Sequence, residues 1–358
     1  MTDEVDRLDE WLNEDGPAAL TLREHLAPVD GEDGIIFPPT FAGEIGEGRQ
    51  GSTYVVDELR GGKSCLVDSV GSQANRIEPV FQRDPYSGLV PQIIIRAGDQ
   101  EVNLLQVGHR AADAAVRFSG LTTDLDEAFQ VWVRKKDASK LARIAPTSLV
   151  FGAWDSRRTG AKIPRALTSV IRAYDVEVLT RKSQYIPPLE YDGVVEDAII
   201  KDDEKAGGEL GLGHVPAAKS GGGIIVRGGI RRDAVLNLAA IRALGADEAA
   251  ERLNLIRYVF GLALVALSAP MNLSLRQGCI LVRKPDKPVQ VEVVQPDGKR
   301  EPTKLDHQAF LKYAVDAARR FGVGEGRTVD FDPKQVRTFY DQKDKKKQRK
   351  GKGEKGSS

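Results

Sequence analysis

Residues 67–78 combine hydrogen-bonding side chains at spacings that would suit contact with a polar polymer. They follow an apolar run that predicts a buried strand, and Asp68 or Ser69 could cap a helix that begins there. One face of that helix would be apolar, and the other would offer neutral donors and a single forked cation. The polar face carries Ser69, Ser72, Gln73 and Arg76, and Asn75 lies beside these four residues. Such groups can bind a nucleic-acid backbone, although a surface helix with few charges would show the same pattern.

A second segment, residues 151–165, brings aromatic and basic side chains together. Accessible rings can stack on bases while arginine and lysine pair with phosphates. The candidate binding residues in it are Trp154, Ser156, Arg157, Arg158 and Lys162. Asp155 is the one carboxylate of this segment, so the charge balance favours binding. The alternative is that Phe151 and Trp154 belong to the core and that the arginines solvate a turn.

The third segment, residues 205–232, is rich in glycine and carries basic side chains. Glycines allow a backbone to approach a ligand closely, and arginines supply cations. The candidates here are His214, Arg227, Arg231 and Arg232. A flexible surface hairpin without a ligand is the alternative.

Residue types that could break bonds are few and scattered. His109 could act as a general base in a ribonuclease, and Asp68 and Asp155 lie inside the polar segments. A lone histidine at the start of a helix is more often a capping or core residue. The four histidines lack ligand spacing, and Cys65 and Cys279 both lie in apolar runs. We therefore expect no metal, no cofactor and no catalytic residue.

Composition indicates a soluble, cytoplasmic protein. The chain is 41% hydrophobic and 29% charged, as globular proteins are, and two buried free thiols fit a reducing compartment. No apolar segment follows a basic start, and the most apolar window, residues 258–269, is too short to span a bilayer. The 52 basic and 52 acidic residues are unevenly placed: residues 1–33 are strongly acidic and residues 343–358 are rich in lysine. That basic end could hold a polyanion or only solubilise the chain.

The elements that must position these segments show no regular βαβα order, which predicts an α+β fold with antiparallel strand pairs. We expect acidic helices through residue 26, a strand at 147–151, helices at 235–244, 249–267 and 305–321, and paired strands at 279–282 and 289–294. The predicted organisation is an acidic N-terminal segment (1–33), a core with insertions (34–335) and a disordered lysine-rich tail (336–358).

The three segments, in this order, resemble the backbone subunit of the type I-G (formerly I-U) CRISPR effector complex, a branch of the RAMP superfamily. Residues 67–78, residues 151–157 and the glycine-rich stretch ending at 228–231 carry the likeness, which extends from about residue 21 to residue 321. The resemblance implies a modified RRM-like (ferredoxin-like) palm with inserted helices. It also implies a protruding thumb or hairpin, which the glycine-rich residues at about 205–232 would form.

For function, the resemblance implies a non-catalytic, multi-copy subunit of a Cascade antiviral surveillance complex that binds CRISPR RNA. It would hold this guide for pairing with target DNA, beside neighbouring copies of itself and other Cascade subunits, without a membrane. The helix residues and the Trp154 segment would line one groove, and His214 would belong to the thumb. A RAMP-type endoribonuclease that uses His109 or an aspartate is the alternative.

Overall fold

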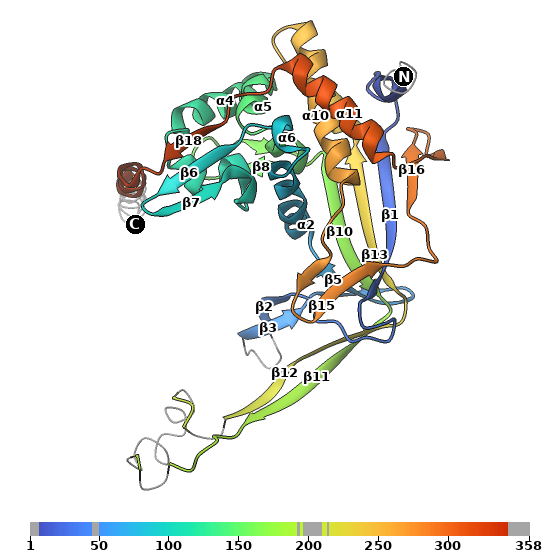
Figure 1. Ribbon diagram of the computed structural model, residues 1–358, viewed down its shortest axis with the longest axis vertical. Coiled ribbons are helices and arrows are strands. Elements are labelled where there is room, and N and C mark those ends of the chain that lie inside the picture. Colours follow the sequence, from blue (N-terminus) through green and yellow to red (C-terminus); the bar gives the residue numbers. More distant parts are fainter. Residues whose placement is uncertain (1–6, 45–49, 192–193, 196–209, 213–214, 343–358) are drawn as a thin grey trace, which may run out of the picture.

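The chain forms a mixed α+β fold around a curled antiparallel sheet (Figure 1), which confirms the predicted α+β class with antiparallel strand pairs. The computed structural model describes residues 7–44, 50–191, 194–195, 210–212 and 215–342. From one edge to the other, the sheet runs β14 (Ser274–Arg276), β15 (Cys279–Arg283), β1 (Ala19–Pro28), β13 (Ile230–Asn237), β10 (Leu167–Tyr174), β5 (Gly62–Asp68) and β4 (Val56–Leu59). β16 (Gln290–Val294) also pairs with β1 and carries β17 (Arg300–Pro302).

β1 is a central strand of this sheet, although we expected acidic helices through residue 26. Leu20, Leu22 and Leu26 are buried, and the alternate residues, such as Thr21 and Arg23, are more exposed. This period of two is typical of a strand with one buried face. The helix prediction is confirmed at residues 7–10 but was wrong for residues 19–26, because it rested on acidic composition rather than on the spacing of the leucines.

β15 and β16 both pair with β1 and not with each other. β15 lies opposite residues 26–28 and β16 lies opposite residues 19–23. The predicted pairing of these two strands was therefore wrong. The ten-residue β1 is long enough to accept both strands end to end, and the Lys284 backbone N–H donates to the His25 carbonyl (3.0 Å) where the chain leaves β15.

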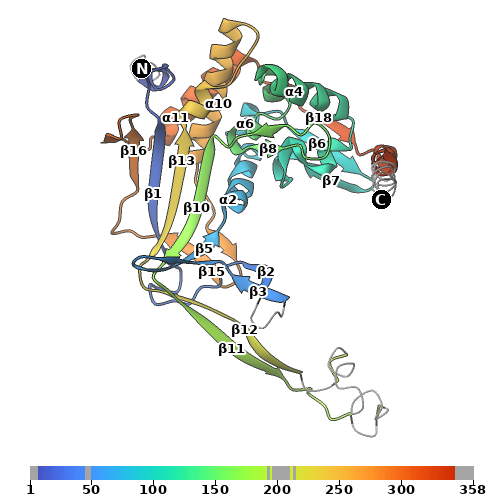
Figure 2. The same cartoon turned by 180° about the vertical axis from the view of Figure 1, so that it is seen from behind.

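Helices cover one face of the sheet, and the opposite face of β1, β13 and β10 is uncovered (Figure 2). The predicted helices at 249–267 and 305–321 are confirmed as α10 (Ala249–Ser268) and α11 (His307–Phe321). A Cβ at Gly261 would lie 2.8 Å from the Cα of Ala314, so glycine allows these two helices to approach closely. The helix expected at 235–244 is shorter, because β13 continues to Asn237 before α9 (Leu238–Arg242) begins.

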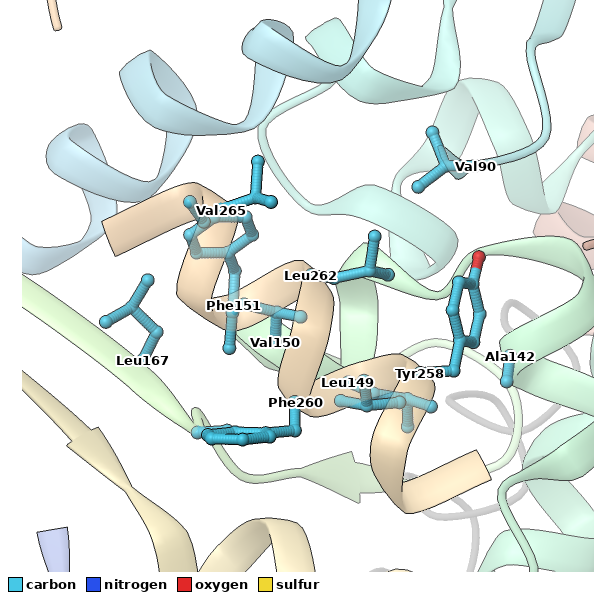
Figure 3. Packing of buried hydrophobic residues seen from close by; sticks show 14 of the residues in the cluster. Val90, Ala142, Leu149, Val150, Phe151, Leu167, Tyr258, Phe260, Leu262 and Val265 are labelled. Atoms are coloured by element: carbon cyan, nitrogen blue, oxygen red, sulfur yellow. The ribbon is translucent and has the colours of Figure 1, made fainter. Parts of the chain in front are cut away.

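Residues 147–151, which we expected to be a strand, form the helix α6 (Thr147–Phe151). All five residues are buried, and Figure 3 shows Leu149, Val150 and Phe151 beside Phe260 and Leu262 of α10. An apolar run this short does not distinguish a buried strand from a buried helix. The run was therefore correctly predicted to be buried but wrongly predicted to be a strand.

The covered face of the sheet contains two hydrophobic clusters separated by polar side chains. The larger cluster lies under α10 and α11 and includes Leu20 and Leu167. The smaller one includes Leu26 and Ile171 from the same two strands, and it holds both cysteines as buried free thiols. Between them lie the buried polar residues Glu24 of β1, Arg232 of β13 and Ser169 of β10. We call these three residues the polar belt.

A second unit lies beside the main sheet and contains α2 (Val70–Ile77), α4 (Thr122–Lys135), α5 (Ser139–Ile144) and a small sheet of β18, β6 and β7. The strands of the small sheet are β18 (Arg327–Asp330), β6 (Ile93–Ala97) and β7 (Gln100–Asn103). The chain is helical after them, over residues 333–342.

The tail predicted to be disordered from residue 336 is therefore helical through residue 342. Thr122 Oγ1 donates to Gln335 Oε1 (2.6 Å), and the ring centroids of Phe118 and Phe339 are 5.7 Å apart. These contacts hold the helix against the body. The lysine-rich residues 343–358 lie outside the described part of the chain.

A two-stranded ribbon, β11 (Val176–Tyr185) and β12 (Val215–Val226), extends away from the body (Figures 1 and 2). It begins at Val176, well before residue 205 where we expected the protruding element. Its base is fixed by Gly223, whose φ of +89° and closeness to Ile36 leave no room for a side chain. The Gly223 N–H also donates to the hydroxyl of Tyr54 (3.0 Å). Among the described residues, no helix is long and apolar enough to cross a membrane.

Candidate functional site

A hollow of about 570 Å³ opens beside the short strands β8 (Ala153–Trp154) and β9 (Lys162–Ile163). It gathers four of the five candidate binding residues of the second segment, together with Arg165 of the same segment and His109. Its described lining is Gly108, His109, Arg110, Gly152, Ala153, Trp154, Ser156, Arg157, Lys162, Ile163, Pro164 and Arg165. None of these lining residues carries a carboxylate, so its charged side chains are cations.

Trp154 is the exposed aromatic of this hollow, with 60% of its surface accessible. The Lys162 ammonium lies 5.0 Å from the centre of its ring, at a distance typical of a cation–π contact. Trp132 Nε1 donates to the Lys162 carbonyl (3.1 Å) and so fixes β9 against α4. The alternative in which Trp154 belongs to the core is therefore wrong, whereas Phe151 is a core residue.

Asp155 is the buried anchor of the loop that carries Ser156 and Arg157. Its carboxylate accepts from the Thr159 backbone N–H (3.0 Å) and hydroxyl (2.7 Å), and it pairs with the buried Arg117 (3.1 Å). These bonds shape the turn between β8 and β9 and leave Ser156 and Arg157 exposed. Asp155 therefore has a structural role.

Gly152 forms part of the wall of the hollow and cannot be replaced without strain. Its φ is +79°, and an added Cβ would lie 2.7 Å from Arg165 Cγ and 3.0 Å from the Ile163 carbonyl oxygen. Glycine therefore lets β9 and the following Arg165 close over residue 152. The Gly152 carbonyl accepts from Arg110 Nη1 (3.4 Å).

Arg110 connects the hollow to α2. Its Nε lies 2.7 Å from Glu78 Oε2 in a buried ion pair, and its Nη2 donates to Asn75 Oδ1 (3.1 Å). Burial raises the pKa of Glu78 to about 7, while the Arg110 charge acts in the opposite direction. Asn75, which is exposed, thus lies beside the hollow as the sequence grouping predicted.

The other predicted contacts of α2 form an internal network around Asp68. Ser69 is the N-cap and accepts from the Ser72 N–H (3.2 Å), so one of the two predicted caps is confirmed. The buried Asp68 accepts from the Ser72 hydroxyl (2.7 Å), from Gln73 Nε2 (2.6 Å) and from Arg76 Nε (3.1 Å). We call Asp68 and these three donors the Asp68 hub.

The prediction that Gln73 contacts the guide RNA was wrong, because this side chain is fully buried. Its amide nitrogen donates to Asp68, and its amide oxygen accepts from Ser169 Oγ of β10 (2.8 Å). Arg76 is 30% exposed, and its Nη2 already donates to the Leu275 carbonyl (2.6 Å). The side of α2 that we expected to face a polymer is thus directed largely toward the protein.

Arg158 is bound to a carboxylate and does not line the hollow. Its guanidinium makes several contacts with Asp126, the closest at 2.6 Å, and these contacts raise the pKa of Arg158. A neighbouring hollow of about 490 Å³ is lined by both Arg157 and Arg158 and by Gln342. Arg157 therefore borders two hollows.

The third predicted segment does not join this site. Arg232 is buried in the polar belt, where Nη1 lies 3.2 Å from Glu24 Oε2, so its assignment as an RNA contact was wrong. Arg231 faces the uncovered side of the sheet, and Arg227 pairs with Glu177 (2.8 Å) at the base of the ribbon. His214 lies outside the described residues.

Sequence reasoning did not assign two exposed basic residues of the hollow, Arg165 and His109, as binding residues. Arg165 was noticed in the second segment but not proposed as a contact, although its basic type and position after Lys162 were a usable signal. His109 was considered only as a catalytic base, and the structure places it on the hollow. Asp68 and Asp155, the other catalytic candidates, are buried and paired with arginines.

Comparison with known protein families identifies a class for this part of the chain. Residues 20–178 match the family described as CRISPR-associated protein GSU0053. The match marks a CRISPR-associated protein family of the RAMP type, which confirms the resemblance at this level and indicates a role in CRISPR defence. The matched residues include β1, α2 and the complete lining of the hollow. No curated protein matches the chain.

Proposed function

We propose that this protein is an RNA-binding backbone subunit of a type I-G Cascade complex and holds the CRISPR guide at the hollow. The observation that carries the proposal is the exposed Trp154 among His109, Arg157, Lys162 and Arg165, in a hollow whose described lining has no carboxylate. The family match supports the CRISPR context. No catalytic step is part of this proposal.

The geometry supports binding of a single strand. A base can stack on the exposed indole of Trp154, because every base offers a π face. Lys162 over the ring, with Arg157 and Arg165 nearby, would pair with the phosphates on either side. Contacts of this kind do not depend on sequence, so base pairing with target DNA would supply the specificity.

The topology supports an RRM-like palm. β1, β10, β13 and β16 are spatially ordered β16–β1–β13–β10, and α9 and α10 lie between β13 and β15 in the chain. A βαββαβ unit of ferredoxin-like type would have this order, with β4, β5 and the second unit as additions. The ribbon of β11 and β12 would then be the thumb that contacts a neighbouring copy.

Binding of fluorescent guide RNA, measured by anisotropy, tests the proposal. Trp154→Ala should weaken binding by about 1–3 kcal/mol, the contribution of one stacked base. Lys162→Gln should also weaken binding, whereas Lys299→Gln, which removes an equally charged and exposed lysine from the turn between β16 and β17, should not. Unchanged affinity in both hollow variants would overturn the site.

The exposure of His109 on the hollow keeps an endoribonuclease as the second candidate. The same RNA, incubated with the protein with and without a divalent metal, distinguishes the two functions. Intact RNA supports the binding subunit. Cleavage that His109→Ala abolishes would establish the nuclease instead.

A further inference from the structure

The uncovered face of the main sheet carries a line of basic side chains. Alternation along β1, β13 and β10 directs leucines and other core residues to the helices and directs their neighbours to this face. The charged residues that these three strands place on it are Arg23 and His25 of β1, Arg231 and Asp233 of β13, and Arg172 of β10. The neighbouring β16 adds Glu292, which pairs with Arg300 (2.8 Å).

Three of these residues form one row across adjacent strands. In the strand register, His25 lies opposite Arg231, and Arg231 lies opposite Arg172. Adjacent strands are separated by about 4.8 Å, so the row is about 10 Å long. We call His25, Arg231 and Arg172 the basic row.

The surroundings of the basic row leave its positive charge incompletely neutralised. Asp233 pairs with Arg231 (2.7 Å) and with Arg23 (3.2 Å), so one carboxylate serves two guanidinium groups. Arg172 makes no ion pair with any residue that the structure describes. Burial and the charges of Lys287, Arg231 and Arg23 lower the pKa of His25, and Asp233 opposes them. Like charges on facing strands destabilise a sheet unless a counter-ion is present.

Tyr174 adds an aromatic ring to this face. The Arg231 guanidinium lies 4.6 Å from the ring centre, and Arg231 Nη2 donates to the Tyr174 hydroxyl (2.9 Å). These contacts hold the forked cation in a fixed position, and its side chain is 29% exposed. A preorganised arginine beside an unpaired one is suited to phosphate oxygens.

We infer that the uncovered sheet face is a second contact surface for the sugar–phosphate backbone of single-stranded nucleic acid. The basic row can therefore lie against the phosphates of an extended strand, whose negative charges repeat along the chain. The inference depends on the proposed function for its kind of ligand but not on the hollow as the site. The footprint of one subunit would therefore include two separate surfaces.

The test is the salt dependence of binding to fluorescent 30-nucleotide single strands, one RNA and one DNA, by the full chain. Each phosphate contact contributes about 0.7 to the slope of log K against log salt for a single strand. Arg172→Gln should lower the slope by that amount for at least one strand. Arg96→Gln, which removes an exposed arginine from β6 in the second unit, should leave the slope unchanged.

The outcomes separate this inference from the proposed function. A wild-type slope in Arg172→Gln for both strands would overturn the inference, even if Trp154→Ala weakens binding. A lower slope in Arg172→Gln with unchanged binding in both Trp154→Ala and Lys162→Gln would retain the second surface and overturn the hollow. A protein that binds neither strand would overturn both.

Discussion

The Asp68 hub and the Trp154 hollow contain similar residue types, but they use them in opposite ways. In the hub, a buried carboxylate lies within hydrogen-bond distance of the serine, amide and guanidinium groups that follow it. In the hollow, the local carboxylate, Asp155, is directed into the protein by Arg117 and Thr159, and the cations remain accessible. The position of one carboxylate therefore decides whether polar side chains stabilise the fold or face a ligand.

The hub should make the larger contribution to stability. Asp68→Asn removes the charge that compensates Arg76 and Arg276, and breaking a buried pair in this way costs about 3–5 kcal/mol. Urea unfolding followed by circular dichroism measures the loss. Asp57→Asn on β4 is the matched control, because an exposed substitution should change the unfolding free energy by less than about 0.5 kcal/mol. If Asp68→Asn and Asp57→Asn lowered the unfolding free energy equally, the stabilising role of the Asp68 hub would be contradicted.

Glu78 lies between the Asp68 hub and the hollow, and its contribution to the stability of the fold should depend on pH. Its pKa rises from 4.5 to about 7 on burial, so the folded state binds the proton more tightly than the unfolded state. Its contribution to stability is complete below pH 4.5 and is lost as the pH rises to 7. The unfolding free energy of wild type minus that of Glu78→Gln should therefore fall by up to about 3 kcal/mol over this range. If urea unfolding showed that this difference in unfolding free energy does not change with pH, the raised pKa of Glu78 would be contradicted.

Gln73 and Asn75 provide the most direct comparison, because they are two positions apart on one helix. Gln73→Ala should lower the unfolding free energy by about 1–3 kcal/mol, since Asp68 and Ser169 lose a buried partner. It should not change the affinity of the folded protein for guide RNA. Asn75→Ala should weaken RNA binding and cost less stability. If the Gln73→Ala variant kept its full stability but bound RNA more weakly, this result would show that Gln73 and its side of α2 contact the RNA.

Long periodic elements could be predicted from the sequence, because their signal is local. α10 and α11 were found at nearly their correct positions. α6 was mistaken for a strand because five buried residues show no period. β1 was missed because the helix prediction rested on its acidic surroundings.

The site was predictable to the extent that its residues are adjacent in the chain. Trp154, Ser156, Arg157 and Lys162 line one hollow because a single turn presents them. Gln73 and Arg232 could not be recognised as buried, because their partners Ser169 and Glu24 lie far away in sequence. Burial of a polar side chain depends on such distant partners, which the local pattern does not reveal.

The polar belt also separates two hydrophobic clusters that should differ in the free energy needed to open them. Val176 and Ile224, at the base of the ribbon, belong to the smaller hydrophobic cluster, whereas the wall of the hollow contains Ile163 of the larger one. Opening the smaller cluster exposes less apolar surface than global unfolding does. The ribbon can therefore change its direction through a sub-global fluctuation, while the geometry of the hollow is maintained by a separate cooperative unit.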